Sequence, residues 1–426
     1  MSSIVQTTSS STFDIADLAK KARAASLQAA QLDTSTKNNL LTAMAKNIKA
    51  GQEQILAENA KDIDAGKAQG LSTAMLDRLL LNSARIDGIA SAMMDIVSLA
   101  DPVGSVSATT KRPVGIEVAK MRIPLGVIAM IYEARPNVTA EAAALCLKSG
   151  NGVILRGGKE ALHSNLAIAN ILHQTLLEFG LLPEVISVVP DPDRAVIAKL
   201  LTLNQDIDLV IPRGGEGLIR YVSDNSRIPV IQHFKGVCHL FVDKYADLDK
   251  AINILVNGKT QRPSACNSLE TVLVHQDVAS EFFTRAAIAL NEFKVKIHAC
   301  PQSIKYFDGA TLATNDDYDA EYLAQEIAVK QVATYNDAIA HIQQYSSDHT
   351  EVIVTQDYSR SREFVRRINS SVVMVNASSR FSDGGELGLG SEIGISTSKL
   401  HAYGPMGLEA LTTEKFVVFG DGEVRA

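Results

Sequence analysis

The chain has little of what marks an extracellular, membrane-spanning or metal-binding protein. Only four cysteines occur among its 426 residues, and no two of them form a CxxC pair: Cys146, Cys238, Cys266 and Cys300. This sparse usage argues against a disulfide framework and against a zinc site, and it fits a reducing, cytoplasmic compartment. No run of 18 or more apolar residues is present, so no membrane span is expected.

An excess of basic charge is also missing. The formal net charge is −7, acids and bases are interspersed, and no basic stripe is available to neutralise the phosphates of a nucleic acid. The nine histidines lack the HxH and HExxH spacings of metal sites, so each is expected to be structural or exposed. The Ser/Thr-rich first dozen residues lack the basic and apolar regions of a signal peptide and predict a frayed tail. These absences favour an enzyme that acts on a small molecule.

What is present is an α/β pattern in a chain too long for one compact core. Residues 15–32 place apolar side chains at steps of three and four, and the first hundred residues are predicted to be helical. Strand-like and helix-like segments then alternate, which predicts a doubly wound parallel sheet. The predicted strands are 114–123, 127–132, 153–156, 185–189, 207–211 and 229–231, and the helices are 139–147, 165–177, 194–203 and 218–222.

A second α/β series follows a boundary expected near residues 233–240. Its predicted strands are 239–242, 270–274, 351–354 and 372–375, and its helices are 279–290, 338–345 and 359–368. The tail, residues 412–419, is strand-like and could add to the edge of a sheet or to a partner subunit.

The most informative stretch is Thr-Gln-Arg-Pro-Ser-Ala-Cys-Asn, residues 260–267. It sets Cys266 among small and polar neighbours just before a strand-like run, which predicts a loop. A structural cysteine usually lies within an apolar pattern, whereas a loop thiol can meet a substrate. A cysteine thiol is partly ionised near neutral pH, and its thiolate form is a nucleophile. An inert, partly buried thiol is the alternative, and the local sequence does not separate the two.

Three turns that contain charged or amide side chains follow strands of the first lobe, at the end where open α/β sheets bind their ligands. They span residues 132–137, 156–160 and 213–217. Glycines let backbone N–H groups approach phosphates, and neighbouring basic side chains supply charge. The predicted dinucleotide contacts are Arg156, Gly157, Gly158, Lys159, Arg213, Gly214 and Gly215. Arg156 and Lys159 would suit the 2′-phosphate of NADP, and a glycine-rich helix cap is the alternative interpretation.

Asn137 opens the helix after the first of these turns. An Asn at such a position is most often a helix cap. If its amide instead faces Cys266, it can donate a hydrogen bond to an oxyanion, which is worth roughly 100- to 1,000-fold in rate.

Six stretches, in order along nearly the whole chain, resemble one known family. They are IYEARPNVT (131–139), VILRGGKE (153–160), IPRGG (211–215), KTQRPSACN (259–267), VNASSRFSDGGELGLGSEIGIS (375–396) and GPMGLEALTTEK (404–415). The chain resembles the gamma-glutamyl phosphate reductases (glutamate-5-semialdehyde dehydrogenases) of proline biosynthesis, in the aldehyde dehydrogenase superfamily. The resemblance implies an aldehyde-dehydrogenase-like α/β fold with a Rossmann-like nucleotide-binding lobe, a second α/β catalytic lobe and a small β oligomerisation element.

The resemblance also implies a division of the chain. Residues 1–235 would form the nucleotide-binding domain and residues 236–375 the catalytic domain. Residues 376–426 would return to the first domain and end in the oligomerisation strand, which would combine with residues 108–124.

The resemblance assigns roles to four residues. Cys266 would be the nucleophile, and Asn137 with the backbone N–H of Cys266 would form the oxyanion site. Arg156 takes the place of a lysine that contacts the adenosine ribose, and Glu326 that of a glutamate on the nicotinamide ribose. The cofactor would be NADPH/NADP, and no metal is expected.

The implied reaction is the reduction of L-glutamyl 5-phosphate by NADPH to L-glutamate 5-semialdehyde and phosphate, through a thioester on Cys266. Arg135, Arg262 and Arg380 are candidates for the substrate carboxylate and Glu133 for its ammonium group, and each could equally form a structural ion pair. The implied partners are glutamate 5-kinase, which would hand over the acyl phosphate, and further copies of this chain in a dimer or tetramer.

Departures from the family pattern keep alternatives open. Aldehyde-oxidising relatives carry a water-activating Glu where this chain has residues 233–238, His-Phe-Lys-Gly-Val-Cys, without that acid. Tyr403 replaces an arginine of the pattern His-Ala-Arg-Gly-Pro, and Lys235 stands where a small residue is expected. The alternatives are a semialdehyde dehydrogenase that uses water as acceptor, and a hydrolase without redox cofactor in which His233, His239 or His275 activates Cys266.

Overall fold

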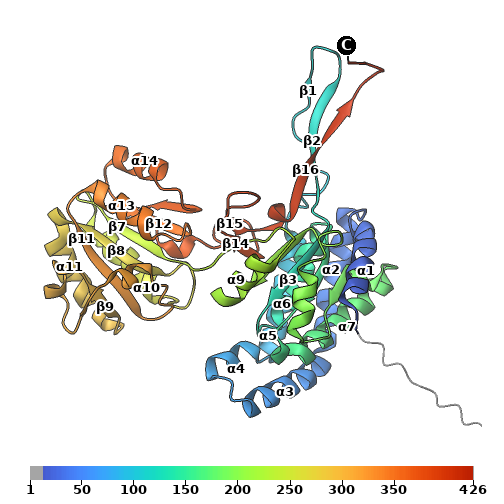
Figure 1. The fold of residues 1–426 in the computed structure, drawn as a ribbon, viewed down its shortest axis with the longest axis horizontal. Helices are drawn as coiled ribbons and strands as arrows, with labels where there is room; N and C mark the ends of the chain where they lie inside the picture. Colours follow the sequence, from blue (N-terminus) through green and yellow to red (C-terminus); the bar gives the residue numbers. More distant parts are fainter. Residues whose placement is uncertain (1–12, 426) are drawn as a thin grey trace, which may run out of the picture. The chain divides into compact units, whose positions relative to one another are not determined.

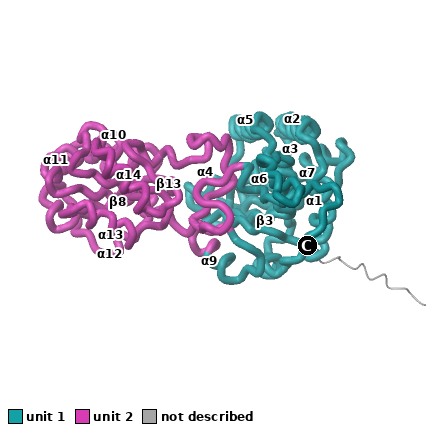
Figure 2. The backbone as a smooth tube through the Cα atoms, turned by 90° about the horizontal axis from the view of Figure 1, so that it is seen from above, with its two compact units in different colours: residues 1–214, 220–230, 408–426 teal, residues 215–219, 231–407 magenta. Residues whose placement is uncertain are grey.

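The computed structural model describes residues 13–425 (Figure 1), so the predicted N-terminal tail lies outside the described residues. The chain divides into two compact units (Figure 2). Unit 1 comprises residues 1–214, 220–230 and 408–426, and unit 2 comprises residues 215–219 and 231–407. The chain thus returns to unit 1 at Leu408, later than the predicted return at residue 376. Among the described residues, no helix combines the length and the apolar character that crossing a membrane requires.

Unit 1 begins with the predicted helices, which are α1 (Ile15–Ala29), α2 (Thr34–Ala50), α3 (Gln52–Ala68), α4 (Thr73–Leu79) and α5 (Ser83–Ser98). The side chains of Asp14, Asp33, Ser72 and Asn82 accept backbone N–H groups at four of the N-termini. Such caps satisfy donors that the first helical turn leaves unpaired. The helical prediction for the first hundred residues is therefore confirmed.

A four-stranded parallel sheet follows in unit 1, in the order β5-β4-β3-β6. Its strands are β3 (Val127–Tyr132), β4 (Gly152–Arg156), β5 (Ile186–Val188) and β6 (Leu209–Arg213), and the helices of this region are α6 (Asn137–Lys148), α7 (Leu162–Glu178) and α8 (Arg194–Leu200). Helix α9 (Glu216–Asn225) follows β6, and only its part from Arg220 onward belongs to unit 1. Strands β3, β4 and β5 are fully buried, as parallel strands covered on both faces are. The predicted strand at 229–231 is wrong, because only a single bridge joins Val210 to Val230 there.

A separate three-stranded antiparallel sheet of unit 1 joins β1 (Thr110–Lys111), β2 (Glu117–Pro124) and β16 (Thr412–Phe419) (Figure 1). The register runs from Thr412 opposite Pro124 to Phe419 opposite Glu117. The predicted pairing of this region with the C-terminal strand is confirmed. Phe416, Val418 and Phe419 are exposed on β16.

Unit 2 is built on a seven-stranded parallel sheet in the order β10-β9-β11-β8-β7-β12-β13. Its strands are β7 (Cys238–Val242), β8 (Leu269–His275), β9 (Lys296–Ala299), β10 (Thr311–Leu312), β11 (Glu326–Val332), β12 (Thr350–Val354) and β13 (Val372–Val375). The helices are α10 (Leu248–Thr260), α11 (Gln276–Glu292), α12 (Asn315–Asp319), α13 (Tyr335–Tyr345) and α14 (Tyr358–Arg367). A short ladder pairs β14 (Gly394–Ser396) with β15 (Gly404–Met406). The α/β fold class is confirmed.

Candidate active site around Cys266

Cys266 lies in a tight turn between helix α10 and strand β8, as the sequence predicts. The turn is closed by two backbone hydrogen bonds, from Ala265 N to Arg262 O at 3.1 Å and from Ser268 N to Ala265 O at 2.9 Å. Cys266 is half-buried, whereas Cys146, Cys238 and Cys300 are buried. Of the four thiols, Cys266 is therefore the one that a dissolved reactant can reach.

The backbone of this turn packs against Gly236, just before β7, and Cys238, the first residue of β7. The thiol of Cys238 donates to the carbonyl oxygen of Cys266 at 3.3 Å. A Cβ added to Gly236 would lie 2.1 Å from the same oxygen, so only glycine fits there. The backbone N–H of Gly236 in turn donates to the Glu321 carboxylate at 2.9 Å. The position of Cys266 thus depends on close backbone packing against Gly236.

A second set of bonds ties the same turn to the segment after β13. The side-chain amide of Asn267 donates to the carbonyl oxygen of Ser382 at 2.8 Å, and the hydroxyl of Ser379 donates to the Asn267 carbonyl at 2.6 Å. Both Asn267 and Ser379 are buried. The nucleophile is therefore carried by a loop that is fixed on two sides, which suits a group that must meet a reacting carbon.

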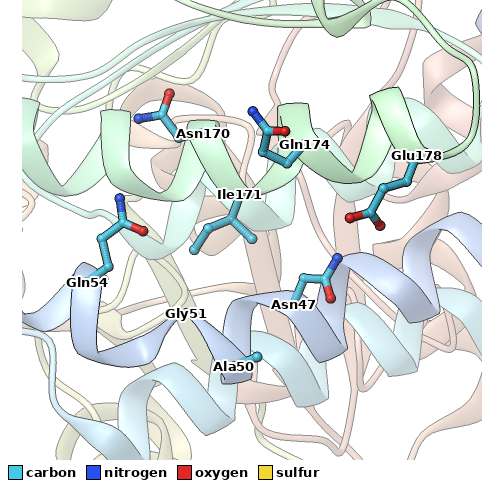
Figure 3. Close-up of a pocket in the computed structure, with 8 residues that line it drawn as sticks. All are labelled: Asn47, Ala50, Gly51, Gln54, Asn170, Ile171, Gln174 and Glu178. Carbon is cyan, nitrogen blue, oxygen red and sulfur yellow. The ribbon is translucent and has the colours of Figure 1, made fainter.

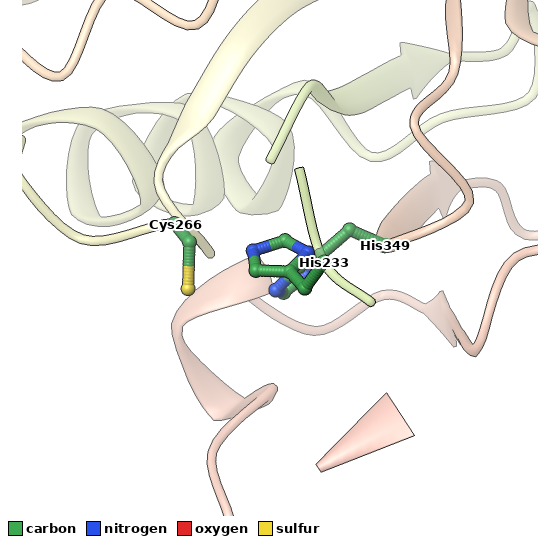
Figure 4. Close-up of side chains that lie close together, drawn as sticks. All are labelled: His233, Cys266 and His349. Carbon is green, nitrogen blue, oxygen red and sulfur yellow. The ribbon is translucent and has the colours of Figure 1, made fainter. Parts of the chain in front are cut away.

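Two histidines stand beside Cys266 (Figure 4). One ring nitrogen each of His233 and His349 and the sulfur of Cys266 lie within 4.8 Å of one another. The two imidazole centroids are 5.0 Å apart. Burial, with a smaller contribution from His233, lowers the pKa of His349 to about 3. His349 is thus neutral at physiological pH and is only a weak proton acceptor.

The sequence predicted only part of this histidine arrangement. Of the three candidate bases, His233 lies beside Cys266. His239 is buried and its Nδ1 pairs with Glu351 at 2.9 Å, while the Nδ1 of His275 accepts the backbone N–H of Asp277 at the start of α11. His349 was missed, because a lone histidine just before a strand carries no sequence signal.

Arg380 brings positive charge to the same unit. Its Nε donates to the side chain of Gln261 at 2.8 Å, while its buried Nη1 has no hydrogen-bond partner. Burial, and next the neighbouring charge of Arg262, lower the pKa of Arg380. A hollow of about 250 Å³ adjoins it, lined by Asn257, Gln261, Arg380, Phe381, Asp383 and Glu386. An unpaired guanidinium N–H beside a second arginine fits an anionic group such as a carboxylate or phosphate.

The predicted nucleotide contacts of unit 1 lie at the ends of adjacent parallel strands. Ile131 on β3 pairs with Arg156 on β4, and Tyr132 pairs with Arg213 on β6. Two guanidinium nitrogens of Arg156 bind the protein backbone: Nη1 donates to the Gly157 carbonyl at 3.1 Å and Nη2 to the Pro192 carbonyl at 2.6 Å.

Two groups at this edge have no hydrogen-bond partner among the described residues. The Nε of Arg156 is buried without a hydrogen-bond partner. In the described part of the chain, exposed Lys159 makes no hydrogen bond or ion pair. A Cβ at Gly157 would approach the side-chain amide of Asn165 to 2.1 Å, so packing also requires this glycine. A free lysine and an unpaired guanidinium N–H at a glycine turn fit a phosphate-bearing ligand.

Asn137 is not the cap of helix α6. The cap position is Pro136, without a side-chain bond, and the Asn137 amide donates to Glu141 one turn further on at 3.1 Å. The interpretation as a cap is therefore wrong. Asn137, like exposed Glu133 and Arg135, belongs to unit 1, whereas Cys266 belongs to unit 2. The role of Asn137 as an oxyanion donor stays a prediction.

Glu326 opens strand β11 and is bound by two basic side chains. It accepts from Lys296 Nζ at 2.7 Å and from His298 Nε2 at 2.5 Å. Burial acts to raise the pKa of Glu326, but the hydrogen bonds and the charges of Lys296 and His298 together outweigh it, and the pKa is lowered. The carboxylate is therefore ionised and oriented, and its contact with a nicotinamide ribose stays a prediction.

The two departures from the family pattern have structural roles. The hydroxyl of Tyr403 donates to the backbone carbonyl of Asn369. Lys235 Nζ forms an ion pair with Asp319 at 2.6 Å and also bonds the Asp319 carbonyl. Both side chains bind backbone carbonyls in loops of unit 2. At Tyr403 a neutral hydrogen bond therefore takes the place of the positive charge that the family arginine would carry.

A larger hollow, of about 720 Å³, lies in unit 1 between α2, α3 and α7 (Figure 3). Its lining is rich in side-chain amides and consists of Asn47, Ala50, Gly51, Gln54, Asn170, Ile171, Gln174 and Glu178. The helices meet closely here, because a Cβ on Gly51 would lie 2.5 Å from Ile171 Cδ1. The lining offers no nucleophile and no basic group, so this hollow is not the site of the chemistry.

Comparisons with known proteins supply the family. The model of the aldehyde dehydrogenase family matches residues 2–304. The gamma-glutamyl phosphate reductase of Colwellia psychrerythraea is 67% identical, over 97% of this chain and 99% of that protein. That of Salinibacter ruber is 56% identical, over 98% of this chain and 96% of that protein. The crystal structure of gamma-glutamyl phosphate reductase from Thermotoga maritima has a TM-score of 0.95 at 41% identity, covering 97% of this chain and 100% of that chain.

A more distant likeness shows the fold alone. An acetylating aldehyde dehydrogenase from Geobacillus thermoglucosidasius has a TM-score of 0.67 at 14% identity, covering 97% of both chains. The chain belongs to the aldehyde dehydrogenase family and, within it, to the gamma-glutamyl phosphate reductases.

Proposed function

We propose that this chain reduces L-glutamyl 5-phosphate to L-glutamate 5-semialdehyde and phosphate with NADPH, in a reducing, cytoplasmic compartment. The names of the relatives supply the substrate, and the observation that carries the chemistry is the half-buried Cys266 on a turn fixed from two sides. A nucleophile so held needs little reorganisation before it attacks.

In the proposed first step the sulfur of Cys266 attacks the acyl carbon. A C–S bond forms, the bond from carbon to the phosphate oxygen breaks, and phosphate leaves with the electron pair. The proton that Cys266 loses goes to solvent, because His349 beside the thiol, with its pKa lowered to about 3, is too weak a base to hold it. Asn137 and the Cys266 N–H would donate to the oxygen on which negative charge develops.

NADPH, when bound, supplies the hydride that reduces the thioester carbon, after which the sulfur of Cys266 leaves and the aldehyde is released. The groups proposed to hold its phosphates are Lys159 and the turns at 156–158 and 213–215, and Glu326 would bind its nicotinamide ribose. The support is the free Lys159 and the unpaired Nε of Arg156 at a strand end of unit 1.

For the substrate we propose Arg380, aided by Arg262, as the anchor of an anionic group. The buried, unpartnered Nη1 of Arg380 and the like charge beside it support this choice. The exposed Arg135 and Glu133 remain candidates from unit 1. We also propose that the exposed apolar side chains of β16 are covered by another copy of the chain, with the size of the oligomer to be read from its mass in solution.

The reaction class is tested in reverse. Enzyme, glutamate 5-semialdehyde and NADP⁺ are mixed with and without phosphate, and the appearance of NADPH is followed. The proposal predicts multiple turnovers only with phosphate, and none in Cys266→Ser, which still binds the nucleotide. Sustained turnover without phosphate would instead show water as the acceptor. Full activity of Cys266→Ser would exclude the thioester.

A further inference from the structure

Unit 2 brings together three metal-type ligands from three separate loops. Cys266 comes from the turn before β8, His233 from the segment before β7, and His349 from the residue before β12. We call these three side chains the His–Cys cluster. Because its members lie far apart in the sequence, the cluster has no spacing motif, which is why the sequence predicted no metal site.

The hydrogen bonds of His349 fix which ring nitrogen faces a ligand. The Oγ1 of Thr350 donates its single hydrogen to the hydroxyl of Ser382 at 2.8 Å. The same oxygen lies 2.7 Å from His349 Nδ1, so it must accept from Nδ1–H. The Nε2 of His349 therefore carries a lone pair, and it is buried without any hydrogen-bond partner.

This arrangement is the one that metal-binding histidines show. A ligating imidazole usually donates its second N–H to a neighbouring oxygen, which fixes the tautomer and orients the ring. Here Thr350 supplies that oxygen. A fully buried imidazole with an unused lone pair is costly, and a cation at Nε2 would satisfy it.

The separations suit a tetrahedral cation after a small adjustment. Ligand atoms around Zn²⁺ are roughly 3.3–3.6 Å apart, as follows from Zn–N and Zn–S distances of roughly 2.1 and 2.3 Å. The three ligand atoms here lie within 4.8 Å of one another. Cys266 and His233 are half-buried and can rotate by the difference of about 1 Å, while buried His349 stays in place.

We propose that Cys266, His233 and His349 bind a thiophilic divalent cation of the zinc type and leave the fourth coordination position open. Binding forms the bond from metal to sulfur and releases the thiol proton to solvent, with no change of oxidation state. A sulfur held in this way is not free to attack an acyl carbon, so the cation would be a reversible inhibitor. The inhibition rests on the proposed function, whereas the metal site rests on the three side chains alone.

Binding is measured first, without substrate. The metal-free, full-length protein is titrated with CdCl₂ while the thiolate-to-metal charge-transfer absorption is recorded. One equivalent should produce the band, and Cys266→Ser should abolish it. His349→Asn keeps an amide donor for Thr350 but removes the Nε2 ligand, and it should weaken binding at least tenfold. The matched control His163→Asn changes an exposed histidine of unit 1 and should titrate as the wild type does.

Two results overturn the site: a band that persists in Cys266→Ser, or equal titrations of His349→Asn and the wild type. Circular dichroism of each variant shows whether it is folded. Should His349→Asn fail to fold, Thr350→Val replaces it, because losing the second-shell hydroxyl is expected to cost roughly 10- to 100-fold in affinity. Equal titration of folded Thr350→Val and wild type would then overturn the site.

Turnover is measured separately with ZnCl₂. The concentration for half inhibition should rise at least tenfold in His349→Asn, and a chelator should restore the wild type. A cadmium band that is lost in Cys266→Ser and weakened in His349→Asn, in a protein whose turnover Zn²⁺ does not affect, would support the metal site and count against Cys266 as the nucleophile.

Discussion

Gly236 offers the sharpest mechanical test of how Cys266 is held. In Gly236→Ala the new Cβ would lie 2.1 Å from the Cys266 carbonyl oxygen and 3.1 Å from its Cα. Because such contacts do not fall below 3.0 Å, the backbones of residue 236 and Cys266 must move apart by at least 0.9 Å. A misplacement of about 1 Å at a reacting group can cost roughly 100-fold in rate. We therefore expect kcat of the phosphate-dependent reaction to fall about 100-fold.

The assay pairs kcat with thermal unfolding, so that a loss of rate is separated from a loss of fold. Gly88→Ala is the matched control, because nothing lies within 4 Å of the Cβ it would add. Gly88 lies inside helix α5, where alanine is favoured by about 1 kcal/mol. Wild-type kcat in a normally folded Gly236→Ala protein would refute the claim that close packing at Gly236 positions the nucleophile.

Three further predictions concern buried titratable side chains and the unpaired N–H of Arg380. The pKa of His349 is about 3 in the fold and about 6.5 when unfolded, so the free energy of unfolding should fall as pH drops from about 6.5 towards 3. Denaturant titrations across this range should show a weaker pH dependence in His349→Asn, and an equal dependence would contradict the assignment. In the wild type the buried carboxyl of Glu270 lies 2.7 Å from the Lys259 ammonium. Lys259→Met removes the partner of this carboxyl and should lower the free energy of unfolding by about 3–5 kcal/mol. The double variant Lys259→Met/Glu270→Leu should recover part of that loss, and no recovery would argue against the pair. Arg380→Gln should raise KM for the acyl phosphate roughly tenfold or more at unchanged melting temperature, as expected for a lost charged hydrogen bond of about 1.5–3 kcal/mol. The same change at exposed Arg78 should leave KM unchanged, and equal KM values for both variants would remove Arg380 from the substrate site.

Much of the fold follows from local sequence patterns. The apolar run of β3 and the helix caps at Ser72 and Asn82 are local signals, and the structure contains those elements. Strands β9 and β11 were missed because their polar residues interrupt the apolar pattern. Glu326 on β11 and His298 on β9 bond to each other across the sheet, and such a pair becomes visible only once the strands are adjacent.

The site was predictable where chemistry and loop signals coincide. Cys266 has small, polar neighbours, which predict the turn that the structure contains. Gly236, Glu321 and His349 were not predictable, because each acts on that turn or on its thiol from a distant loop. Nothing in a single sequence records that such loops converge. Asn137 shows the converse, since its local pattern suggested a cap and its amide bonds Glu141 instead.

The central claim is that Cys266 becomes acylated, and trapping that state tests it most directly. The enzyme is mixed with glutamate 5-semialdehyde and NADP⁺ in the absence of phosphate, quenched with acid and digested for mass spectrometry. The account predicts a single turnover of NADPH and a glutamyl adduct on the peptide that contains Cys266. A full burst of NADPH with the adduct on another residue, or the same burst from Cys266→Ser, would contradict it.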